Sequence, residues 1–527
     1  MASIWFKTDD TVLEKTDKEL AAGVLHLKKL LRARNWLRSS LLRLPTEIIV
    51  HILSYATQKS AHSSVWQPIT STCHHIRKVM CTSTELWRRA DFTKDALASL
   101  AFERSQGNFE VVVADLLVGG ERIKNTWRFC RDNIALSCHR LRTLEVCGYP
   151  SHLADFSWIF ERPLPHLERL KINFAPERQE GNNFYLSNPV PLQLPTDPPI
   201  RALDLRNAIL PWSSSLFTGL SELHLDFRDC DEFVEISEED MLGVFEASPQ
   251  LESLSLCQLL VKVNREQGYT PSRTVKLASL KSLKLDSFPI LVGYMLGHMV
   301  IPAIEYLKIR GEFSPWGVEG SLSYFFPDDH LPNRLFPNPS IFEVWPDCGD
   351  GIYDSLKVNI GNCHIQFDFD MDENEISSET IMSCVLPLVP ASVNALRLDY
   401  SQLDEDAQWP EFFLTHPEVR SIEFSNEGPV SESLWDALSP GKMGGVTLCP
   451  KLESITLSKQ RASAPLLNCL LDRKTAGFEL KRLKLWTVDE RVAHTFGIFV
   501  EQLQVIETRP TETRRRVSPI LDGWNRN

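Results

Sequence analysis

The stretch LLRLPTEIIVHILSY, residues 41–55, determines how the start of this chain is interpreted. Pro45 fits the first turn of a helix, where the N–H that proline lacks would have no partner in any case. The following residues place apolar side chains one, three and four positions apart: Ile48, Ile49, Ile52, Leu53 and Ala56. Such a stripe is wide enough for two contacts, one with a small core of its own and one with something outside it. The sequence therefore predicts an amphipathic docking helix.

A helix is predicted ahead of this stretch, over residues 10–40. Its apolar residues keep helical spacing on one side: Leu20, Val24, Leu27, Leu31 and Leu37. Basic residues gather in its C-terminal half, where the helix dipole favours positive charge.

Two more helices are predicted after the stretch. The first covers about residues 67–80, and its apolar positions are spaced four, three and four: Ile69, Cys73, Ile76 and Met80. The second is short, carries Leu86 and Trp87, and has Ser83 as its predicted N-cap. Three short helices with apolar stripes are thus expected within residues 41–95.

Together these pieces resemble the F-box. That family shows Leu-Pro-x-Glu, an Ile/Leu-rich helix, a helix with Val-Cys-x-x-[Trp/Ile]-[Arg/Lys], and a terminal Leu-Trp. The matching positions are Leu44, Pro45, Glu47, Ile48, Ile52, Leu53, Cys73, Ile76, Arg77, Leu86 and Trp87. The resemblance covers about residues 15–95, and the leading helix is similar to that of many fungal F-box proteins. Two departures are the long polar linker ATQKSAHSSVWQ and Ile76, which stands where Trp is more usual.

The resemblance implies a function without catalysis. In this family the helices dock on the Skp adaptor of a cullin–RING ubiquitin ligase, and the rest of the chain holds a protein substrate near the ubiquitin-charged enzyme. The residues predicted for the core and the adaptor-binding surface together are Leu44, Pro45, Ile48, Ile52, Leu53, Cys73, Ile76, Leu86 and Trp87. The sequence leaves their division between these two roles open, and a purely internal three-helix core is the alternative.

From residue 141 onward the chain repeats the pattern apolar-x-x-apolar-x-apolar. Eleven copies occur: LRTLEV (141), LERLKI (167), IRALDL (200), LSELHL (220), LESLSL (251), LKSLKL (280), IEYLKI (304), VNALRL (393), VRSIEF (419), LESITL (452) and LKRLKL (480), with YDSLKV (353) as a weaker twelfth. Period-two alternation puts two apolar side chains on one face of a short strand, and the first apolar residue packs beneath it. One unit cannot bury this face alone, whereas a stack of parallel units can.

The predicted fold class is α/β: a small helical F-box followed by an irregular leucine-rich-repeat solenoid with parallel strands on its concave face. This arrangement resembles the fungal F-box/leucine-rich-repeat-like family, with helix-like segments such as EEDMLGVFEAS, SESLWDALS and PLLNCLLDRK between copies. The Asn that usually follows each repeat is replaced by Ala175, Ala208, Arg228, Leu259 and Phe288, so no asparagine ladder is expected. The predicted domains are an N-terminal helix (1–40), the F-box (41–95), the array (96–505) with an insertion loop at about 310–350, and a tail (506–527).

The polar strand face of the array is the predicted substrate-binding surface. Two groups on it each combine an aromatic side chain with two cations: Tyr306, Lys308 and Arg310, and Arg482, Lys484 and Trp486. Such groups suit an acidic or phosphorylated peptide. The alternative for each group is a solvated charged face without a partner, and the substrate protein is not identified by the sequence.

Composition restricts the class of function. The chain has 527 residues, of which 43% are hydrophobic and 24% charged, as in ordinary globular proteins. Its net charge of −13 argues against a nucleic-acid partner. Apolar runs are too short for a membrane span, and MASIWFKTDDTVLEK is unlike a secretory signal, so no membrane partner and a cytoplasmic or nuclear location are expected. The 12 cysteines form no CxxC pair and are predicted to be buried thiols.

Motifs for chemistry are weak. In the CHH sequence at 73–75 the two histidines are adjacent on a predicted helix, so their side chains face different directions. A metal site is therefore not predicted there. Asp368, Asp370, Asp372 and Glu379 have the spacing of a calcium loop, but Glu373 stands where that loop needs Gly, so a strand with an apolar and an acidic face is predicted. The segment RRRVSP at 514–519 is interpreted as a solvated tail, with a phosphorylation site or nuclear signal as alternatives.

We therefore predict a non-catalytic subunit with no catalytic residue, no metal and no cofactor. Nucleotide-binding and hydrolase motifs such as GxxxxGK[ST], GxSxG and HExxH do not occur in the sequence. The main alternative is a leucine-rich-repeat scaffold that binds a partner without joining a ligase. An unrecognised hydrolase is a third and more distant hypothesis.

Overall fold

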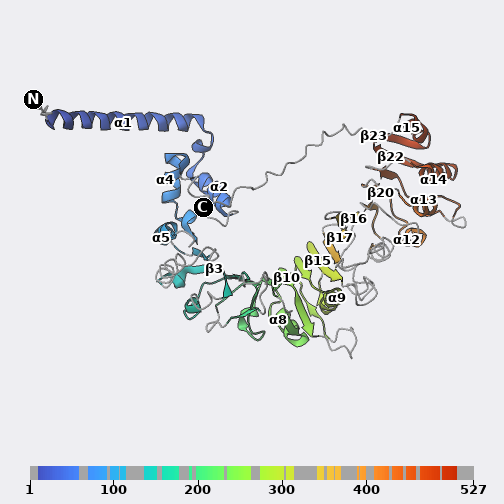
Figure 1. The fold of residues 1–527 in the computed structure, drawn as a ribbon, viewed down its shortest axis with the longest axis horizontal. Helices are drawn as coiled ribbons and strands as arrows, with labels where there is room; N and C mark the ends of the chain where they lie inside the picture. Colours follow the sequence, from blue (N-terminus) through green and yellow to red (C-terminus); the bar gives the residue numbers. More distant parts are fainter. Residues whose placement is uncertain are drawn as a thin grey trace, which may run out of the picture. The chain divides into compact units, whose positions relative to one another are not determined.

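In the computed structural model the chain forms two compact units, residues 1–211 and 212–527, whose elements are drawn in Figure 1. The structure describes residues 10–58, 69, 71–91, 95–105, 107, 109–113, 136–150, 157–176, 189–192, 198–230, 234–262, 273–301, 304–313, 341–348, 353–360, 363–369, 389–390, 392–398, 409–425, 430–442, 447–457, 463–486 and 490–506. The predicted domain boundaries stay predictions; the division between the units falls inside the predicted array.

The first unit opens with a series of helices. They are α1 (Asp10–Arg38), the 3-10 helix η1 (Leu41–Arg43), α2 (Thr46–Gln58), α4 (His74–Thr82), the 3-10 helix η3 (Thr84–Trp87) and α5 (Asp95–Arg104). The helix predicted over residues 10–40 is confirmed, and its apolar stripe is exposed along its length. We call η1, α2, α4 and η3 the head.

One predicted helix of the head is interrupted: residues 69, 71 and 72 are helical, and a separate helix, α4, begins after Cys73. Cys73 was assigned to the apolar stripe of a helix over 67–80, but it is the N-cap of α4 in extended conformation, with φ −158° and ψ 163°. Its sulfur accepts a 3.4 Å hydrogen bond from the backbone N–H of Ile76, a donor that the helix start would otherwise leave without a partner. Ser83 occupies the predicted N-cap of η3, but its side chain makes no capping hydrogen bond.

Parallel strands complete the first unit. They pair in the order β1 (Arg89–Asp91), β2 (Phe109–Val113), β3 (Leu141–Gly148), β4 (Arg169–Phe174) and β6 (Ala202–Arg206). A second, two-stranded pair joins β5 (Val190–Pro191) to β7 (Ala208–Ile209). The 3-10 helices η4 (Cys138–Arg140) and η6 (Ser157–Ile159) precede β3 and β4.

The second unit contains two runs of parallel strands. The first run is β8 (Glu222–Asp226), β10 (Ser253–Cys257), β13 (Ser282–Asp286) and β15 (Tyr306–Phe313), and the second is β19 (Ala395–Leu398), β20 (Ser421–Phe424), β21 (Ser454–Leu457), β22 (Leu480–Trp486) and β23 (Val500–Ile506). Shorter parallel pairs join β9 (Val234–Ser237) to β11 (Leu259–Lys262) and β12 (Val275–Lys276) to β14 (Met299–Val300).

Short helices precede or follow many strands of the second unit. They are η7 (Ser215–Phe217), α8 (Glu238–Ala247), α9 (Pro289–His298), α12 (Trp409–Thr415), α13 (Glu432–Leu438), α14 (Ala464–Thr475) and α15 (Glu490–Gly497). In Figure 1 α8 and α9 lie on one side of β10 and β15, and α13–α15 lie on one side of β20–β23. The three helix-like segments predicted between copies form α8, α13 and α14 and are confirmed.

All eleven predicted copies end in a strand that pairs parallel with a neighbour, so the parallel-strand sheet is confirmed. The register aligns the apolar positions: Leu223, Leu254, Leu283 and Leu307 form one row, and Leu225, Leu256, Leu285 and Ile309 form the next. Each of these side chains is at most 2% exposed. Period-two alternation therefore buries one face of the sheet and leaves the polar side chains on the other.

The weaker twelfth copy is not a repeat unit. YDSLKV lies in β17 (Tyr353–Ile360), which pairs antiparallel with both β16 (Ile341–Cys348) and β18 (Cys363–Phe369). The sheet order is β15–β18–β17–β16–β19, because β18 pairs with β15 and β16 pairs with β19, both in parallel. Three consecutive strands are thus inserted between the two parallel runs.

This insertion differs from the loop expected at about 310–350. Residues 310–313 are the end of β15 and residues 341–348 form β16, so both ends of that range are strand. Residues 314–340, with the aromatic residues predicted there, lie outside the described residues.

An asparagine hydrogen bond, which we call the asparagine rung, joins two neighbouring copies of the repeat in the first unit. Asn207, one place before the position where the family has its Asn, is fully buried and donates a 2.6 Å hydrogen bond from Nδ2 to the carbonyl of Phe174. Its backbone has a φ of +54°, which Asn adopts more readily than most residues. Three copies later Ser287 donates in a similar way, over 3.2 Å, from its hydroxyl to the carbonyl of Leu259.

We expect Asn207→Ala to lower the free energy of unfolding by about 1–3 kcal/mol, because the buried Phe174 carbonyl loses this donor. Asn207→Gly is the matched control: it also removes the amide, but glycine takes a positive φ without strain. The alanine variant should therefore lose more stability than the glycine variant in urea unfolding followed by circular dichroism. Wild-type stability of both variants would contradict the rung.

Candidate functional site

The head is built around one small core. Buried side chains from η1, α2, α4 and η3 form it: Leu42, Ile49, Leu53, Ile76, Val79, Met80 and Leu86. Val50, Ile69 and Cys73 pack against this core while partly buried. The sequence prediction missed Leu42 and Val79, although both keep helical or near-helical spacing from predicted core residues.

Trp87 ties the head to α5. Its indole Nε1 donates a 2.6 Å hydrogen bond to the backbone carbonyl of Met80. The guanidinium carbon of Arg104, on α5, lies 4.8 Å from the centre of the indole ring, within the range of a cation–π contact. Trp87 is 5% exposed, so these contacts are internal and its role is structural.

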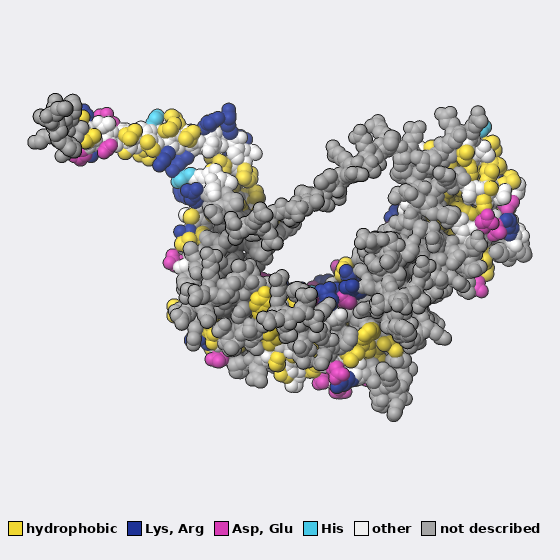
Figure 2. All heavy atoms as spheres, in the orientation of Figure 1, with side chains coloured by type: hydrophobic (Ala, Val, Ile, Leu, Met, Phe, Trp, Pro, Cys, Tyr) yellow, Lys and Arg dark blue, Asp and Glu magenta, His cyan; other side chains and the backbone are white. Residues whose placement is uncertain are grey.

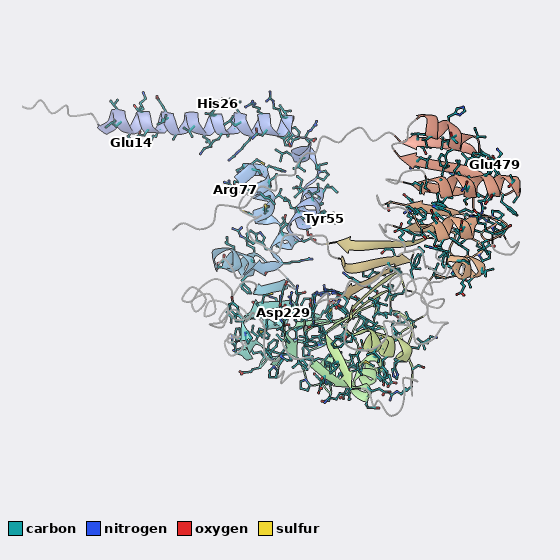
Figure 3. All side chains as sticks on the ribbon, turned by 45° about the vertical axis from the view of Figure 1, so that its right-hand side comes forward. Glu14, His26, Tyr55, Arg77, Asp229 and Glu479 are labelled. Atoms are coloured by element: carbon teal, nitrogen blue, oxygen red, sulfur yellow. The ribbon has the colours of Figure 1, made fainter. Side chains whose placement is uncertain are left out.

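A second apolar face of α2 points to solvent. Leu44 just before α2, and Ile48, Ile52 and Tyr55 on it, are 37%, 48%, 41% and 60% exposed. Their spacings of four, four and three place them along one side of the helix, and we call them the α2 ridge. Figure 3 labels Tyr55 on α2 and Arg77 on α4. A contiguous exposed row of large apolar side chains is typical of an interaction surface.

The nine predicted adaptor-binding residues fall into two sets. Leu44, Pro45, Ile48 and Ile52 are exposed, whereas Leu53, Ile76, Leu86 and Trp87 are buried and Cys73 is half-buried. Because the buried set fills the head, only the exposed set is available for a partner without unfolding. Tyr55 extends the exposed set and was missed, although its place three residues after Ile52 is a usable signal.

The weaker chemical motifs gain no support from the described residues. Cys73 is a helix cap and His74 is exposed, and within the described ranges no three His, Cys, Asp or Glu side chains are placed to hold a metal ion. Asp368 lies in β18, as the predicted strand requires, while Asp370, Asp372 and Glu379 lie outside the described residues. The eight cysteines that are described are all free thiols.

Two cations on the polar face of the sheet are neutralised by carboxylates on both flanking strands. On β4 the Lys171 ammonium lies 3.1 Å from Glu145 and 3.9 Å from Asp204, on the two flanking strands. Burial lowers the pKa of Lys171, but the two carboxylates outweigh it and hold that pKa above its usual value. On β19 Arg397 pairs with Glu343 and, over 3.2 Å, with Glu423.

The first predicted substrate group lies on β15. Tyr306, Lys308 and Arg310 alternate with the buried Leu307 and Ile309, so the three share the polar face as predicted. Arg310 is partly neutralised, because its Nη1 lies 3.8 Å from a carboxylate oxygen of Asp286 on β13. Tyr306 is 42% exposed.

The second predicted group lies on β22, where Arg482 is exposed and Lys484 half-buried. Trp486 ends β22, and its side chain lies outside the described residues. The two groups are not brought together, because β18, β17, β16, β19, β20 and β21 separate β15 from β22. At about 4.8 Å per strand they lie roughly 30 Å apart along the sheet.

Comparison with known protein families identifies the head. An F-box-like family model matches residues 41–93, the range that holds α2, α4 and η3. No curated protein matches the chain. The chain therefore carries an F-box-like domain, a type that typically binds the Skp adaptor in proteins that are generally non-catalytic substrate receptors. The match ends before most of the strands, so the leucine-rich repeat and the fungal family stay predictions.

No helix among the described residues is long and apolar enough to cross a membrane.

Proposed function

We propose that this protein is the substrate-recognition subunit of a Skp–cullin–F-box ubiquitin ligase. The observation that carries the proposal is the α2 ridge: an F-box-like domain that has filled its own core still exposes Leu44, Ile48, Ile52 and Tyr55. A standard interface buries about 800 Å² on each partner, with a few large side chains at its centre supplying most of the affinity. An aliphatic row flanked by an aromatic side chain has the composition of such a centre.

The strands after the head are proposed to form an irregular leucine-rich-repeat solenoid that holds the substrate. Three runs of parallel strands, each in register within itself, support this, because stacked units of that kind present a continuous polar face along each run. Tyr306, Lys308 and Arg310 are the first proposed substrate contacts, and Arg482, Lys484 and Trp486 the second. The chain supplies no reacting group; it holds substrate lysines near the charged enzyme, in the cytoplasm or nucleus.

The test uses the full chain with a purified Skp adaptor and a cullin–RING complex. We expect a one-to-one complex with the adaptor, with a Kd of about 1 µM or lower by calorimetry, and a larger complex by size exclusion when the cullin is added. Failure to bind the adaptor would overturn the proposal. Binding to the adaptor without recruitment of the cullin would instead support the ligase-independent scaffold.

A further inference from the structure

Two lysines on the polar face of the second unit stand side by side. The parallel register of β13 and β15 places Lys284 directly opposite Lys308, on strands that lie about 4.8 Å apart. Like charges in this position destabilise a sheet. We call Lys284 and Lys308 the lysine pair.

The described carboxylates do not neutralise this pair. Lys171 and Arg397 each have carboxylates on both neighbouring strands, whereas no described Asp or Glu forms an ion pair with Lys284 or Lys308. Two acids near the pair in the register are engaged elsewhere. Asp226 binds Arg228 over 2.6 Å, and Asp286 lies 3.8 Å from Arg310. Among the described side chains the two ammonium groups are therefore a local surplus of positive charge, in a chain of net charge −13.

The surroundings of the pair add hydrogen-bonding groups. On the other side of Lys284, β10 carries only small side chains on this face: Ser253, Ser255 and Cys257. His224 follows on β8, opposite Ser255, and Tyr306 lies on β15 two residues before Lys308. Figure 2 shows dark-blue Lys and Arg side chains, with some magenta Asp and Glu side chains beside them, near the place of β10 and β15 in Figure 1.

We propose that the lysine pair binds a doubly negative group on a protein segment, which is the substrate if the proposed function holds. The group is a phosphate ester or two adjacent carboxylates, since either accepts charge-assisted hydrogen bonds from two ammonium groups at once and cancels their repulsion. A short acidic segment fits better than nucleic acid, because the strongly negative chain repels an extended polyanion. The proposal moves the centre of the predicted β15 group from Arg310, which Asp286 already engages, to Lys284 on β13.

The test measures peptide capture by the full chain. Three peptide pools share randomised flanks and differ at the centre: phosphoserine, Glu-Glu, or unmodified Ser. We expect the wild type to enrich at least one anionic pool about tenfold over the Ser pool, and Lys284→Glu/Lys308→Glu to abolish that enrichment. Lys276→Glu is the matched control, because Lys276 is an exposed lysine on β12, outside the sheet that carries the pair, and its variant should stay within about twofold of wild type.

Each outcome decides between stated alternatives. Enrichment of the phosphoserine pool alone identifies a phosphate ester, and equal enrichment of the Glu-Glu pool identifies clustered carboxylates. Equal capture of all three pools, unchanged enrichment by the double variant, or tighter binding of a uridine oligonucleotide would overturn the proposal. Lys284→Gln/Lys308→Gln repeats the test without added negative charge, should the first variant be unstable.

Failure of this proposal differs from failure of the proposed function. The double lysine variant should bind the Skp adaptor like the wild type, because the pair lies on β13 and β15, outside the F-box-like domain. If the wild type captures anionic peptides and ignores the adaptor, the lysine pair is a binding site and the ligase assignment is wrong. If the wild type binds the adaptor and captures no anionic peptide, the ligase assignment stands and the lysine pair is not a binding site.

Discussion

A chain carrying Ile48→Asp and Ile52→Asp should keep its fold and lose more than about 100-fold of its affinity for the Skp adaptor. Both side chains are exposed, at 48% and 41%, so the substitutions remove no core packing. Each carboxylate would have to be desolvated against an apolar partner surface, which is costly without an opposite charge. Calorimetry with the full chain measures the loss, and thermal unfolding measures the fold.

Two controls separate the ridge from the core and from general effects of charge. Leu471→Asp introduces the same group at a leucine of similar exposure, 43%, on α14 of the second unit, and should leave adaptor affinity unchanged. Leu53→Asp places the charge in the head core, where the side chain is 7% exposed, and should lose binding together with the stability of the head. Unchanged binding by the ridge variant, or an equal loss in Leu471→Asp, would contradict the assigned surface.

The strands could be predicted from sequence because their signal is local. In LKSLKL the two leucines of the alternating end lie on one face of β13, and Leu280 packs beneath from the preceding turn. Alternation does not encode strand direction, however, so YDSLKV was assigned to the array although β17 runs antiparallel to its neighbours. The Gly361–Asn362 dipeptide between two alternating runs is a hairpin signal that would have separated it.

The functional surfaces were predictable in kind but not in detail. The apolar stripe of α2 showed that two contacts were possible, yet only the packed head shows that Leu53 faces inward and Ile52 outward. Whether a cation on the sheet is neutralised depends on residues that are far apart in the sequence. Arg397 and its partner Glu343 are 54 positions apart in sequence and meet only through the pairing of β16 with β19. Sequence alone therefore could not tell a neutralised cation from the surplus at Lys284.

Arg473 shows the same limit inside the second unit. It is a charged residue in the last turn of α14, and no sequence pattern predicts its burial, yet it is fully buried. Its Nη1 donates over 3.1 Å to the carbonyl of Leu438, the last residue of α13, and its Nη2 donates over 3.1 Å to the carbonyl of Cys449. The negative end of the α13 dipole therefore faces the guanidinium.

No carboxylate among the described residues compensates this charge. The two nearby thiols do not act as counter-ions, because burial raises the pKa of Cys449 to about 12 and that of Cys469 to about 11, so both are neutral near pH 7. Burial also lowers the pKa of Arg473 from its ordinary value. Carbonyl dipoles alone thus hold a buried cation that links α13, the segment before β21 and α14.

We expect Arg473→Ala to lower the free energy of unfolding by about 4 kcal/mol, since two buried carbonyls lose their donor and a cavity replaces the side chain. Arg473→Met is the matched control, because it fills the volume without a donor or a charge. Arg473→Met should lower the free energy of unfolding by less than Arg473→Ala does. The difference between the two variants measures the contribution of the cavity. Urea unfolding measures both, and hydrogen exchange should show the loss in α13 and α14 first. Wild-type stability of the alanine variant would contradict the anchor.

Arg473→Lys distinguishes charge from hydrogen bonding through pH. Burial disfavours a charged lysine, so its folded pKa should fall below the unfolded value of about 10.4. Between those two values the unfolded chain binds more protons than the folded chain, so the stability of this variant should rise as pH rises toward 10.4. An arginine remains protonated throughout that window, so the wild type should lack this rise. If the difference in free energy of unfolding between the two proteins does not change with pH, the lysine ammonium reaches solvent. In that case packing does not force the side chain at residue 473 to be buried.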